Sequence, residues 1–351
     1  MSLDKDIFWM QRALDLAIMG SGFVAPNPLV GCVIVKDEII IGEGYHQNYG
    51  EAHAEVNAVH SLINPSEIIG ATVYVNLEPC SHHGKTPPCA DLLIKNRARR
   101  VVICNMDPNP IVAGEGIAKL KAAGIEVEVG LLAEKGEELN RKFFHFQREK
   151  KPYITLKFAC SQDHFIAKIN GESITFSNSE SQQLVHKMRA ENQAILIGIQ
   201  TAIADNPSLN VRYWQGNSPI RIIIDPSNRL PKELKLVQDQ EPLLVFTKLH
   251  SETIDNKKWI AVGDKNPQEF LESILDYCYQ NNIQSIMVEG GTRTANQLLT
   301  AGLINEIWKI EKQIKLGEGI LAPILTDVVF EKKFMVGQDN IWSKAIIPKL
   351  S

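Results

Sequence analysis

The sequence predicts an α/β protein with two domains, an α/β/α sandwich followed by a second α/β domain. Short apolar segments typical of strands alternate with segments of helical periodicity along most of the chain. A length of 351 residues is enough for two domains with separate cores. A charged run at 148–151, ended by Pro152, is typical of a boundary between domains. We therefore predict domains at 1–147 and 148–351.

The first half begins with a helix that ends at Gly20, because apolar residues recur before it at helical spacing. A hairpin of strands 29–35 and 38–44, turned at 36–37, comes next. Helices and strands then alternate, which predicts a largely parallel sheet after the hairpin. The alternating segments are a helix from 53 to about 62, a strand at 72–76, a helix from about 88, a strand at 101–104, a helix near 116–123, a strand at 125–129, and a closing helix that carries Leu139, Phe143, Phe144 and Phe146.

The second half has the same alternation and predicts a second layered α/β structure. The expected strands are 153–159, 194–199, 220–224, 243–246 and 285–289, and the expected helices lie near 180–189, near 268–279 and from 292.

Composition limits the classes of function. The chain is 44% hydrophobic and 22% charged, as in ordinary globular enzymes, and its net charge of −4 gives no general attraction to nucleic acid. The acidic start is unlike a signal peptide, and apolar runs such as 29–35 are too short to span a membrane. Six cysteines spread over this length do not form a disulfide framework. We expect a cytoplasmic enzyme with no nucleic-acid or membrane partner.

Four residues predict a zinc site. His53 and Glu55 begin a helix, Cys80 follows a strand, and Cys89 opens the next helix. One imidazole and two thiolates form a three-ligand Zn²⁺ site that leaves the fourth tetrahedral position open for water. A glutamate two residues from the histidine is placed to move protons, as zinc-dependent nucleobase deaminases require, so we assign Glu55 the catalytic role. The alternative is that His53 caps a helix and both cysteines are ordinary buried thiols.

The loop between the two cysteines is long. Nucleobase deaminases usually place two residues there, whereas this chain has eight, at 81–88. Lys85 in this loop is a candidate phosphate ligand, although a single loop lysine is more commonly solvated. Replacement of a cysteine ligand by His82 or His83 is a further alternative.

Several segments closely resemble the bifunctional riboflavin-biosynthesis deaminase–reductase family. They are 27–31, 53–55, 77–89 and 107–114. The resemblance implies a cytidine-deaminase-like first domain that uses Zn²⁺ to remove an amine from a diaminopyrimidinone bearing a ribosylamino phosphate. It also implies that Asn27, His46 and Lys85 bind this small phosphorylated pyrimidine.

The second half resembles the reductase of the same family, which has a dihydrofolate-reductase-like fold. The matching segments are 198–212 and 288–292. The resemblance implies that NADPH reduces the ribosyl group to ribityl. The implied substrate-binding residues are Lys157, Ser173, Arg189, Leu209, Arg212 and Glu289. The implied NADPH-binding residues are Ala159, Thr175, Thr201, Asp205, Ser227, Gly290, Gly291 and Thr292.

Three segments depart from the family pattern. Gln162 and His164 replace a leucine and a glycine, no tryptophan follows Ser173, and Thr292 replaces a proline. Histidine adopts positive φ less readily than glycine, so we expect a different turn at His164. We still expect an active reductase and a homo-oligomeric enzyme.

Three alternatives remain at this point. One is an active deaminase with an impaired reductase domain. The second is a nucleic-acid-editing zinc deaminase with an unrelated second domain. The third is a zinc-stabilised binding protein, in which the metal would have four protein ligands.

Overall fold

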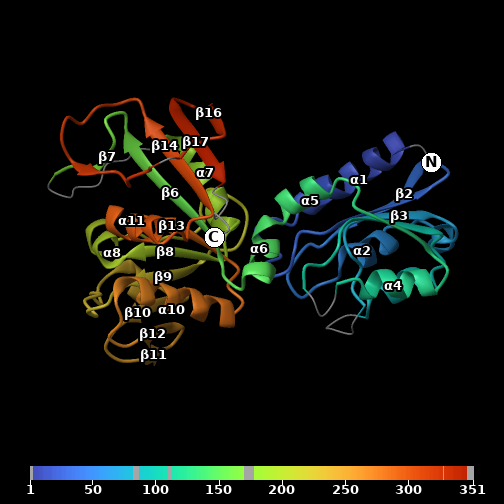
Figure 1. Ribbon diagram of the computed structural model, residues 1–351, viewed down its shortest axis with the longest axis horizontal. Helices are drawn as coiled ribbons and strands as arrows, with labels where there is room; N and C mark the ends of the chain where they lie inside the picture. The colour runs from blue at the N-terminus through green and yellow to red at the C-terminus, as the bar shows by residue number, and fades with distance from the viewer. Residues whose placement is uncertain (1–2, 82–86, 110–112, 170–177, 327, 346–351) are drawn as a thin grey trace. The chain divides into compact units, whose positions relative to one another are not determined.

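The computed structural model divides the chain into two compact units, Met1–Lys150 (unit 1) and Lys151–Ser351 (unit 2) (Figure 1). The described residues are 3–81, 87–109, 113–169, 178–326 and 328–345. None of the helices among them is long and apolar enough to cross a membrane.

Unit 1 is built on a five-stranded sheet with the order β2-β1-β3-β4-β5. The first two strands form an antiparallel hairpin, β1 also pairs antiparallel with β3, and β3, β4 and β5 are parallel. The strands are β1 (Gly31–Lys36), β2 (Ile39–Tyr45), β3 (Thr72–Leu77), β4 (Arg100–Asn105) and β5 (Glu126–Val129). The helices are α1 (Leu3–Ile18), α2 (Ala54–His60), η1 (Pro65–Ile68), α3 (Cys89–Lys95), α4 (Glu115–Ala122), α5 (Ala133–Leu139) and α6 (Arg141–Glu149).

Helices cover both faces of this sheet (Figure 1). On one face, α1 buries Met10 and Leu14 against Tyr74 of β3, and Leu139 of α5 packs against the same cluster. On the other face, α2, α3 and α4 bury a second apolar cluster that includes Ala58 and Leu93. Because successive strand residues point to opposite faces, each central strand supplies side chains to both clusters. This is the predicted α/β/α sandwich.

Two local predictions for unit 1 are wrong. The hairpin turns at Asp37 and Glu38, because Lys36 still pairs with Ile39 as the last strand pair. Both turn residues have positive φ, 50° and 65°, as a two-residue turn that matches the strand twist requires. The closing helix is two helices, broken at Asn140. Its side chain accepts a hydrogen bond from the Leu29 N–H and donates one to the Leu29 carbonyl, at 2.8 and 2.9 Å.

Unit 2 contains a ten-stranded sheet with the order β11-β12-β10-β9-β8-β13-β6-β14-β17-β16. The seven strands from β12 to β14 in this order are parallel, whereas β11, β17 and β16 pair antiparallel. A separate two-stranded sheet joins β7 to β15. The strands are β6 (Tyr153–Ser161), β7 (Phe165–Ala167), β8 (Ala194–Gly198), β9 (Ile220–Ile224), β10 (Leu243–Thr247), β11 (Glu252–Ile254), β12 (Lys257–Ala261), β13 (Ser285–Glu289), β14 (Glu306–Lys312), β15 (Ile320–Leu321), β16 (Lys332–Val336) and β17 (Asp339–Ala345).

Five helices of unit 2 pack on the two faces of this large sheet. Two of them, α10 and α11, bury Ile274 and Leu298 against one face. On the other face, α8 and α9 pack around Ile195, and α7 packs Met188 against Met287. The five are α7 (Ser179–Ala190), α8 (Ile199–Asp205), α9 (Lys235–Gln238), α10 (Pro267–Gln280) and α11 (Thr292–Thr300).

The sequence-based interpretation of unit 2 was incomplete. Ile199 was assigned to a strand, but it begins α8 because the strand ends at Gly198. The elements β7, α8, α9, β11, β12 and all strands after α11 were not predicted.

His164 adopts φ +64°, in the left-handed region that favours glycine, although its side chain makes this conformation less accessible. Histidine is one of the few non-glycine residues enriched in this region. Polar contacts fix the turn, since Asp163 accepts hydrogen bonds from Leu316 and Gly317, the latter at 2.8 Å.

Candidate active sites

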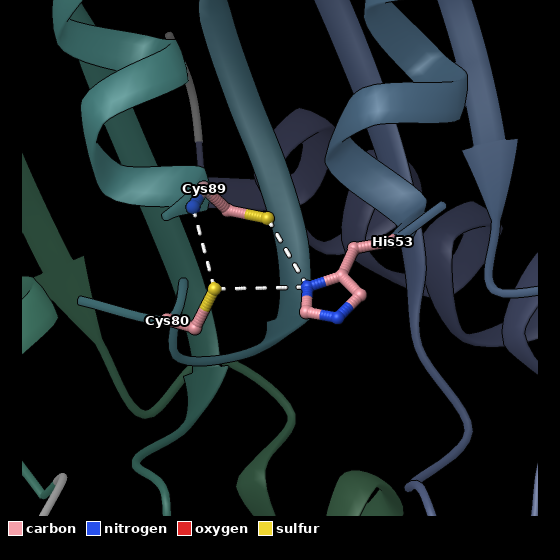
Figure 2. Close-up of side chains that lie close together, drawn as sticks. All are labelled: His53, Cys80 and Cys89. Atoms are coloured by element: carbon pink, nitrogen blue, oxygen red, sulfur yellow. Dashed lines mark hydrogen bonds between the residues drawn. The ribbon is translucent and has the colours of Figure 1, made fainter. Parts of the chain in front are cut away.

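The three predicted zinc ligands come together in unit 1 (Figure 2). His53 lies immediately before α2, Cys80 follows β3 closely, and Cys89 is the first residue of α3. Their ligand atoms all lie within 4.8 Å of one another. In Figure 2 the two sulfur atoms and the Nδ1 atom of His53 point toward a common centre. We call these three residues the ligand cluster.

The spacing of the ligand cluster fits Zn²⁺. A tetrahedral ion bound at about 2.3 Å to sulfur and about 2.05 Å to nitrogen separates these two ligand atoms by about 3.6 Å. The His53 Nδ1 atom lies 3.6 Å from the Cys80 sulfur and 3.3 Å from the Cys89 sulfur. The donor set and its geometry therefore suit a three-ligand zinc site.

The electrostatics of the cluster suit acid–base chemistry. Glu55 is only 3% exposed. Burial, followed by the negative charge of Cys80, raises the pKa of Glu55 to about 7. Hydrogen bonds from Cys89, followed by one from His53, lower the pKa of Cys80 below its ordinary value, which favours the thiolate that a metal binds.

A pocket of about 430 Å³ opens beside the cluster, and Asn27 and His46 line it together with Glu55. The His46 Nδ1 atom lies 3.0 Å from the Ala52 carbonyl, which can only accept. Nδ1 therefore carries the proton, and Nε2 accepts the 3.0 Å hydrogen bond from the Asn27 amide. Burial lowers the pKa of His46, which keeps this arrangement neutral. Lys85, with His82 and His83, lies outside the described residues.

The pocket also contains residues that the sequence did not single out. Phe143 and Gln147 line it from α6, and Tyr49 lines it from the segment after β2. The segment 107–114 was part of the family resemblance without an assigned role, although Asp107 and Asn109 line the same pocket. Only the resemblance could have indicated these two residues, because polar residues in such segments are common.

Glu78 fixes the wall of this pocket. Its carboxylate is 5% exposed and accepts four backbone hydrogen bonds, at 3.0 to 3.2 Å. The donors are the N–H groups of Asp107, Gly114, Gly116 and Ile117. A buried carboxylate is stable when several N–H groups satisfy it. Glu78 therefore connects the strand that leads to Cys80 with the segment that carries Asp107.

Three predicted substrate residues of unit 2 meet at the ends of β6 and β13. Glu289 lies opposite Lys157 in the parallel pairing of these strands. Arg189 binds Glu289 through two hydrogen bonds of 2.7 and 2.8 Å. Burial alone would raise the pKa of Glu289, but Arg189 and then Lys157 lower it to about 2. Burial lowers the pKa of Lys157, and Glu289 opposes this shift.

The other predicted substrate residues have different surroundings. Arg189 donates a hydrogen bond to the backbone carbonyl of Asn210, and Arg212 donates one to the side-chain oxygen of Asn210. Arg212 is exposed, whereas the guanidinium of Arg189 is already paired with Glu289. The side chain of Leu209 is 4% exposed and belongs to the core cluster under α8. Ser173 lies outside the described residues.

A second pocket, of about 390 Å³, lies in unit 2, and we call it the cofactor pocket. Thr201, Ser227 and Gly291 line it, as predicted for NADPH-binding residues. Gly290 packs closely on Thr201, because a Cβ atom at Gly290 would lie 2.8 Å from the Thr201 Cγ2 atom. Both glycines have positive φ, 115° and 73°, which favours glycine at each position.

The remaining predicted NADPH residues are not among those that line the cofactor pocket. Ala159 is half-buried on β6, Asp205 ends α8, and the Thr292 hydroxyl donates a 2.5 Å hydrogen bond to the Leu321 carbonyl. Thr175 lies outside the described residues. Four basic residues that line the pocket were missed, since no motif joins residues so far apart in sequence. They are Arg229, Lys248, Lys265 and Arg293.

Both halves of the chain match models of known protein families. Residues 152–327 match the model of the RibD C-terminal domain, and residues 3–105 match that of the cytidine and deoxycytidylate deaminase zinc-binding region. The riboflavin biosynthesis protein RibD of Aquifex aeolicus is 40% identical over 321 residues, which cover 91% of this chain and 89% of the relative. This chain belongs to the RibD family of riboflavin biosynthesis proteins.

Other members of the RibD family agree with this result. The Escherichia coli K12 protein is 41% identical, with 86% of each chain covered. The structure of Acinetobacter baumannii RibD, form 1, has a TM-score of 0.88 and 35% identity, and it covers 97% of this chain and 99% of that one. The Thermotoga maritima deaminase/reductase structure has a TM-score of 0.88, 34% identity, and coverage of 97% and 98%.

RibD membership confirms the predicted fold class, a cytidine-deaminase-like domain followed by a RibD reductase domain. It also confirms the two cofactors, Zn²⁺ and NADPH. The alternatives of a nucleic-acid-editing deaminase and a zinc-stabilised binding protein are not favoured, because the similarity to bifunctional enzymes extends over both domains.

Proposed function

We propose that residues 1–147 form the deaminase and residues 148–351 the reductase of a bifunctional enzyme of riboflavin biosynthesis. The Thermotoga maritima structure bears the names of both activities, a diaminohydroxyphosphoribosylaminopyrimidine deaminase and a phosphoribosylamino-uracil reductase. The first reaction consumes water and releases ammonia from a phosphorylated diaminopyrimidinone. The second adds hydride from NADPH and a proton to the ribosyl group, which becomes ribityl. The substrate is a free small molecule.

The observation that carries the deaminase assignment is the ligand cluster with Glu55 buried beside it. His53, Cys80 and Cys89 would hold the zinc ion, which would lower the pKa of a bound water and so supply a nucleophilic hydroxide near neutral pH. Glu55 would carry one proton from the attacking water to the ring nitrogen and a second proton, from the hydroxyl group added to the ring carbon, to the amine that leaves as ammonia. Its enclosed position keeps bulk water away from the transferred proton.

Other residues of the same pocket orient the pyrimidine. The His46 hydrogen bond fixes the Asn27 amide, so that its carbonyl oxygen and second N–H can bind the polar edge of the ring. Lys85 binds the phosphate of the ribosylamino group in this proposal, because a lysine is a flexible point charge suited to a phosphate.

The reductase assignment relies on the group formed by Lys157, Arg189 and Glu289 beside the cofactor pocket. Glu289 keeps two cations in place, and Lys157 is then available to bind the sugar oxygens. Arg212, which is exposed, binds the substrate phosphate together with Ser173. NADPH occupies the pocket that Thr201, Ser227 and Gly291 line, with Ala159, Thr175, Asp205, Gly290 and Thr292 in its surroundings.

The test of the deaminase proposal is the variant Glu55→Gln. We expect ammonia release to fall by about 10²- to 10⁴-fold, because the proton transfer is lost while the shape of the pocket is kept. Zinc content, measured by atomic emission, should remain at the wild-type level. The control is Glu134→Gln, which changes an exposed carboxylate on α5 and should leave both values unchanged. Normal deamination by Glu55→Gln would refute the role of Glu55.

A sequential assay tests the order of the two reactions. The purified chain receives the diaminopyrimidinone ribosylamino phosphate, and ammonia is followed with and without NADPH. We expect ammonia release in both cases, and NADPH oxidation only after ammonia has appeared. NADPH oxidation without ammonia release would contradict the proposed order. A cytoplasmic location and a homo-oligomeric state remain predictions from the sequence.

A further inference from the structure

His186, on α7, has a buried imidazole with a defined hydrogen-bonding state. It is 4% exposed, and its Nδ1 atom accepts a 3.0 Å hydrogen bond from the backbone N–H of Arg212. A backbone N–H can only donate, so Nδ1 carries no proton and the ring is a neutral acceptor. Burial, followed by the charges of Arg189 and Arg212, lowers the pKa of His186 to about 4, so the ring remains an acceptor at neutral pH.

Side chains of α7 hold residues 210–214, which we call the Arg212 segment. All of its residues are described, and none belongs to a helix or strand, so no backbone ladder fixes the segment. Besides the hydrogen bond to His186, the segment receives one of 3.2 Å from the Arg189 guanidinium at the Asn210 carbonyl. His186 and Arg189 are three positions apart, so they lie on one face of α7 and contact the segment together.

The direction of the Arg212 guanidinium depends on its neighbours in the segment. It donates a hydrogen bond to the side-chain oxygen of Asn210, and it lies 5.7 Å from the centre of the Tyr213 ring. The Tyr213 ring in turn packs edge to face on the imidazole of His186, with 4.8 Å between the ring centres. Helix α7 therefore contacts the main chain of Arg212 and both residues that flank its guanidinium, which itself stays exposed to an incoming anion.

The Arg212 segment adjoins the group formed by Lys157, Arg189 and Glu289. Arg189 belongs to both, because it donates hydrogen bonds to the Glu289 carboxylate and to the Asn210 carbonyl. The charges of Glu289 and Lys157 also act on the His186 imidazole. One helix thus places the arginine assigned to the substrate phosphate beside the residues assigned to the sugar.

We propose that His186 is a positioning residue of the reductase, which holds the main chain of Arg212 so that the guanidinium meets the substrate phosphate. The proposal rests on the proposed reductase function of unit 2. An arginine in an irregular segment loses conformational freedom when it binds an anion, and a segment that is already fixed loses less. The phosphate is unchanged by the reduction, so its contacts stabilise the ground state and the transition state equally. Loss of His186 therefore raises the KM of the phosphorylated substrate and leaves kcat unchanged.

The experiment compares His186→Leu with His186→Asn in the full chain. Leucine removes the acceptor, whereas the side-chain oxygen of asparagine can accept the Arg212 N–H in place of Nδ1. NADPH oxidation is followed with the deaminated substrate and with its dephosphorylated form. We expect His186→Leu to raise the KM of the phosphorylated substrate about tenfold, as the loss of one hydrogen bond allows. The kcat, and kcat/KM for the dephosphorylated form, should stay at their wild-type values. His186→Asn should restore most of the lost affinity.

A double-mutant cycle with Arg212→Ala tests whether His186 acts through Arg212. The measured quantity is the phosphate preference, the ratio of kcat/KM for the phosphorylated substrate to that for the dephosphorylated form. Arg212→Ala alone should lower this preference, and His186→Leu should lower it no further once the guanidinium is gone. The control is His250→Leu, which makes the same change at an exposed histidine of unit 2 and should leave the preference unchanged.

Three results would overturn the inference. They are an equal loss of kcat/KM with both substrates, a KM that His186→Leu does not raise, and additive effects of His186→Leu and Arg212→Ala. The affinity for NADPH reports whether unit 2 is folded. If His186→Leu loses that affinity, His186→Gln takes its place, because the longer side chain moves the acceptor away from the position of Nδ1. Failure of the proposed reductase function looks different, since wild type would then oxidise no NADPH with either substrate.

Discussion

The ligand cluster of unit 1 and the cofactor pocket of unit 2 are built in different ways. Three ligand atoms within 4.8 Å make the first site, and they come from residues next to β3, α2 and α3. The second site extends along the ends of four parallel strands, and its cations lie on separate turns. A metal requires short and fixed distances, whereas a long dinucleotide can be held by many separate contacts.

This difference predicts how each site responds to a single substitution. Removal of one ligand from the cluster removes a third of the donors, and the other residues cannot replace it. Removal of one contact from the cofactor pocket leaves the other contacts in place. We therefore expect substitutions in the ligand cluster to abolish one activity, and most substitutions in the cofactor pocket to change affinity.

The largest expected effect is that of Cys80→Ser. A hydroxyl is a much poorer zinc ligand than a thiolate, so zinc content should fall and ammonia release should decrease by more than about a thousandfold. NADPH oxidation with the already deaminated substrate should remain at the wild-type rate. Atomic emission and the two separate assays measure these outcomes. A parallel loss of NADPH oxidation would show that the two sites are not independent.

The second variant tests the group formed by Lys157, Arg189 and Glu289 in unit 2. Glu289→Ala leaves the guanidinium of Arg189, which is 13% exposed, and the amine of Lys157 without their counter-charge. Removal of one partner from a buried ion pair costs about 3–5 kcal/mol, so the free energy of unfolding of unit 2 should fall by about this amount. Reductase activity should be lost. Urea unfolding measures the first effect, and ammonia release serves as the control because it should be unchanged.

The third prediction concerns pH and a residue that belongs to neither site. The buried carboxylate of Asp6 accepts two 2.9 Å hydrogen bonds from Arg100 and another from the Tyr74 hydroxyl. The hydrogen bonds with Arg100 lower the pKa of Asp6 below its ordinary value. The ion pair therefore stabilises unit 1 above about pH 4, and this stabilisation is lost as the pH falls through the lowered pKa.

The variant Asp6→Asn isolates this contribution. At pH 7 its free energy of unfolding should be about 1.5–3 kcal/mol lower than that of wild type, and the difference should shrink below about pH 4. Metal-free protein is used at each pH, so that zinc loss does not contribute. A difference that stays constant down to pH 3 would contradict the assignment to Asp6.

The smallest expected effect is that of His164→Gly. His164 is held at φ +64°, where a side chain costs energy that glycine avoids, although glycine also loses more entropy on folding. The free energy of unfolding of unit 2 should rise by less than about 1 kcal/mol. Thermal unfolding measures the change. A clear loss of stability would show that the imidazole makes contacts that stabilise the turn.

The ligand cluster was predictable from the sequence because its chemistry depends on residue types that have few other uses in this pattern. His53, Glu55, Cys80 and Cys89 each stand where a strand ends or a helix begins, and the structure brings all four together. The order of helices and parallel strands was predictable as well, since buried parallel strands are short apolar runs.

Other features could not be predicted, for physical reasons. At the break between α5 and α6, the Asn140 side chain accepts a hydrogen bond from the Leu29 N–H and donates one to the Leu29 carbonyl, and these residues are 111 positions apart. The late strands such as β16, with exposed Phe334 and Met335, lack the clear alternation of buried and exposed residues. The basic residues of the cofactor pocket are each ordinary surface residues in sequence, and only the strand order places them side by side.

The four hydrogen bonds accepted by Glu78 have a consequence for amide exchange. A single carboxylate protects the amides of Asp107, Gly114, Gly116 and Ile117. Asp107 and Gly114 lie outside the helices and strands, whereas Gly116 and Ile117 lie in the first turn of α4, so exchange of the first two amides with deuterium requires release of the Glu78 side chain. Glu78 lies two positions before Cys80. Deuterium uptake at Asp107 and Gly114 would therefore report how often the wall of the deaminase pocket opens beside the metal.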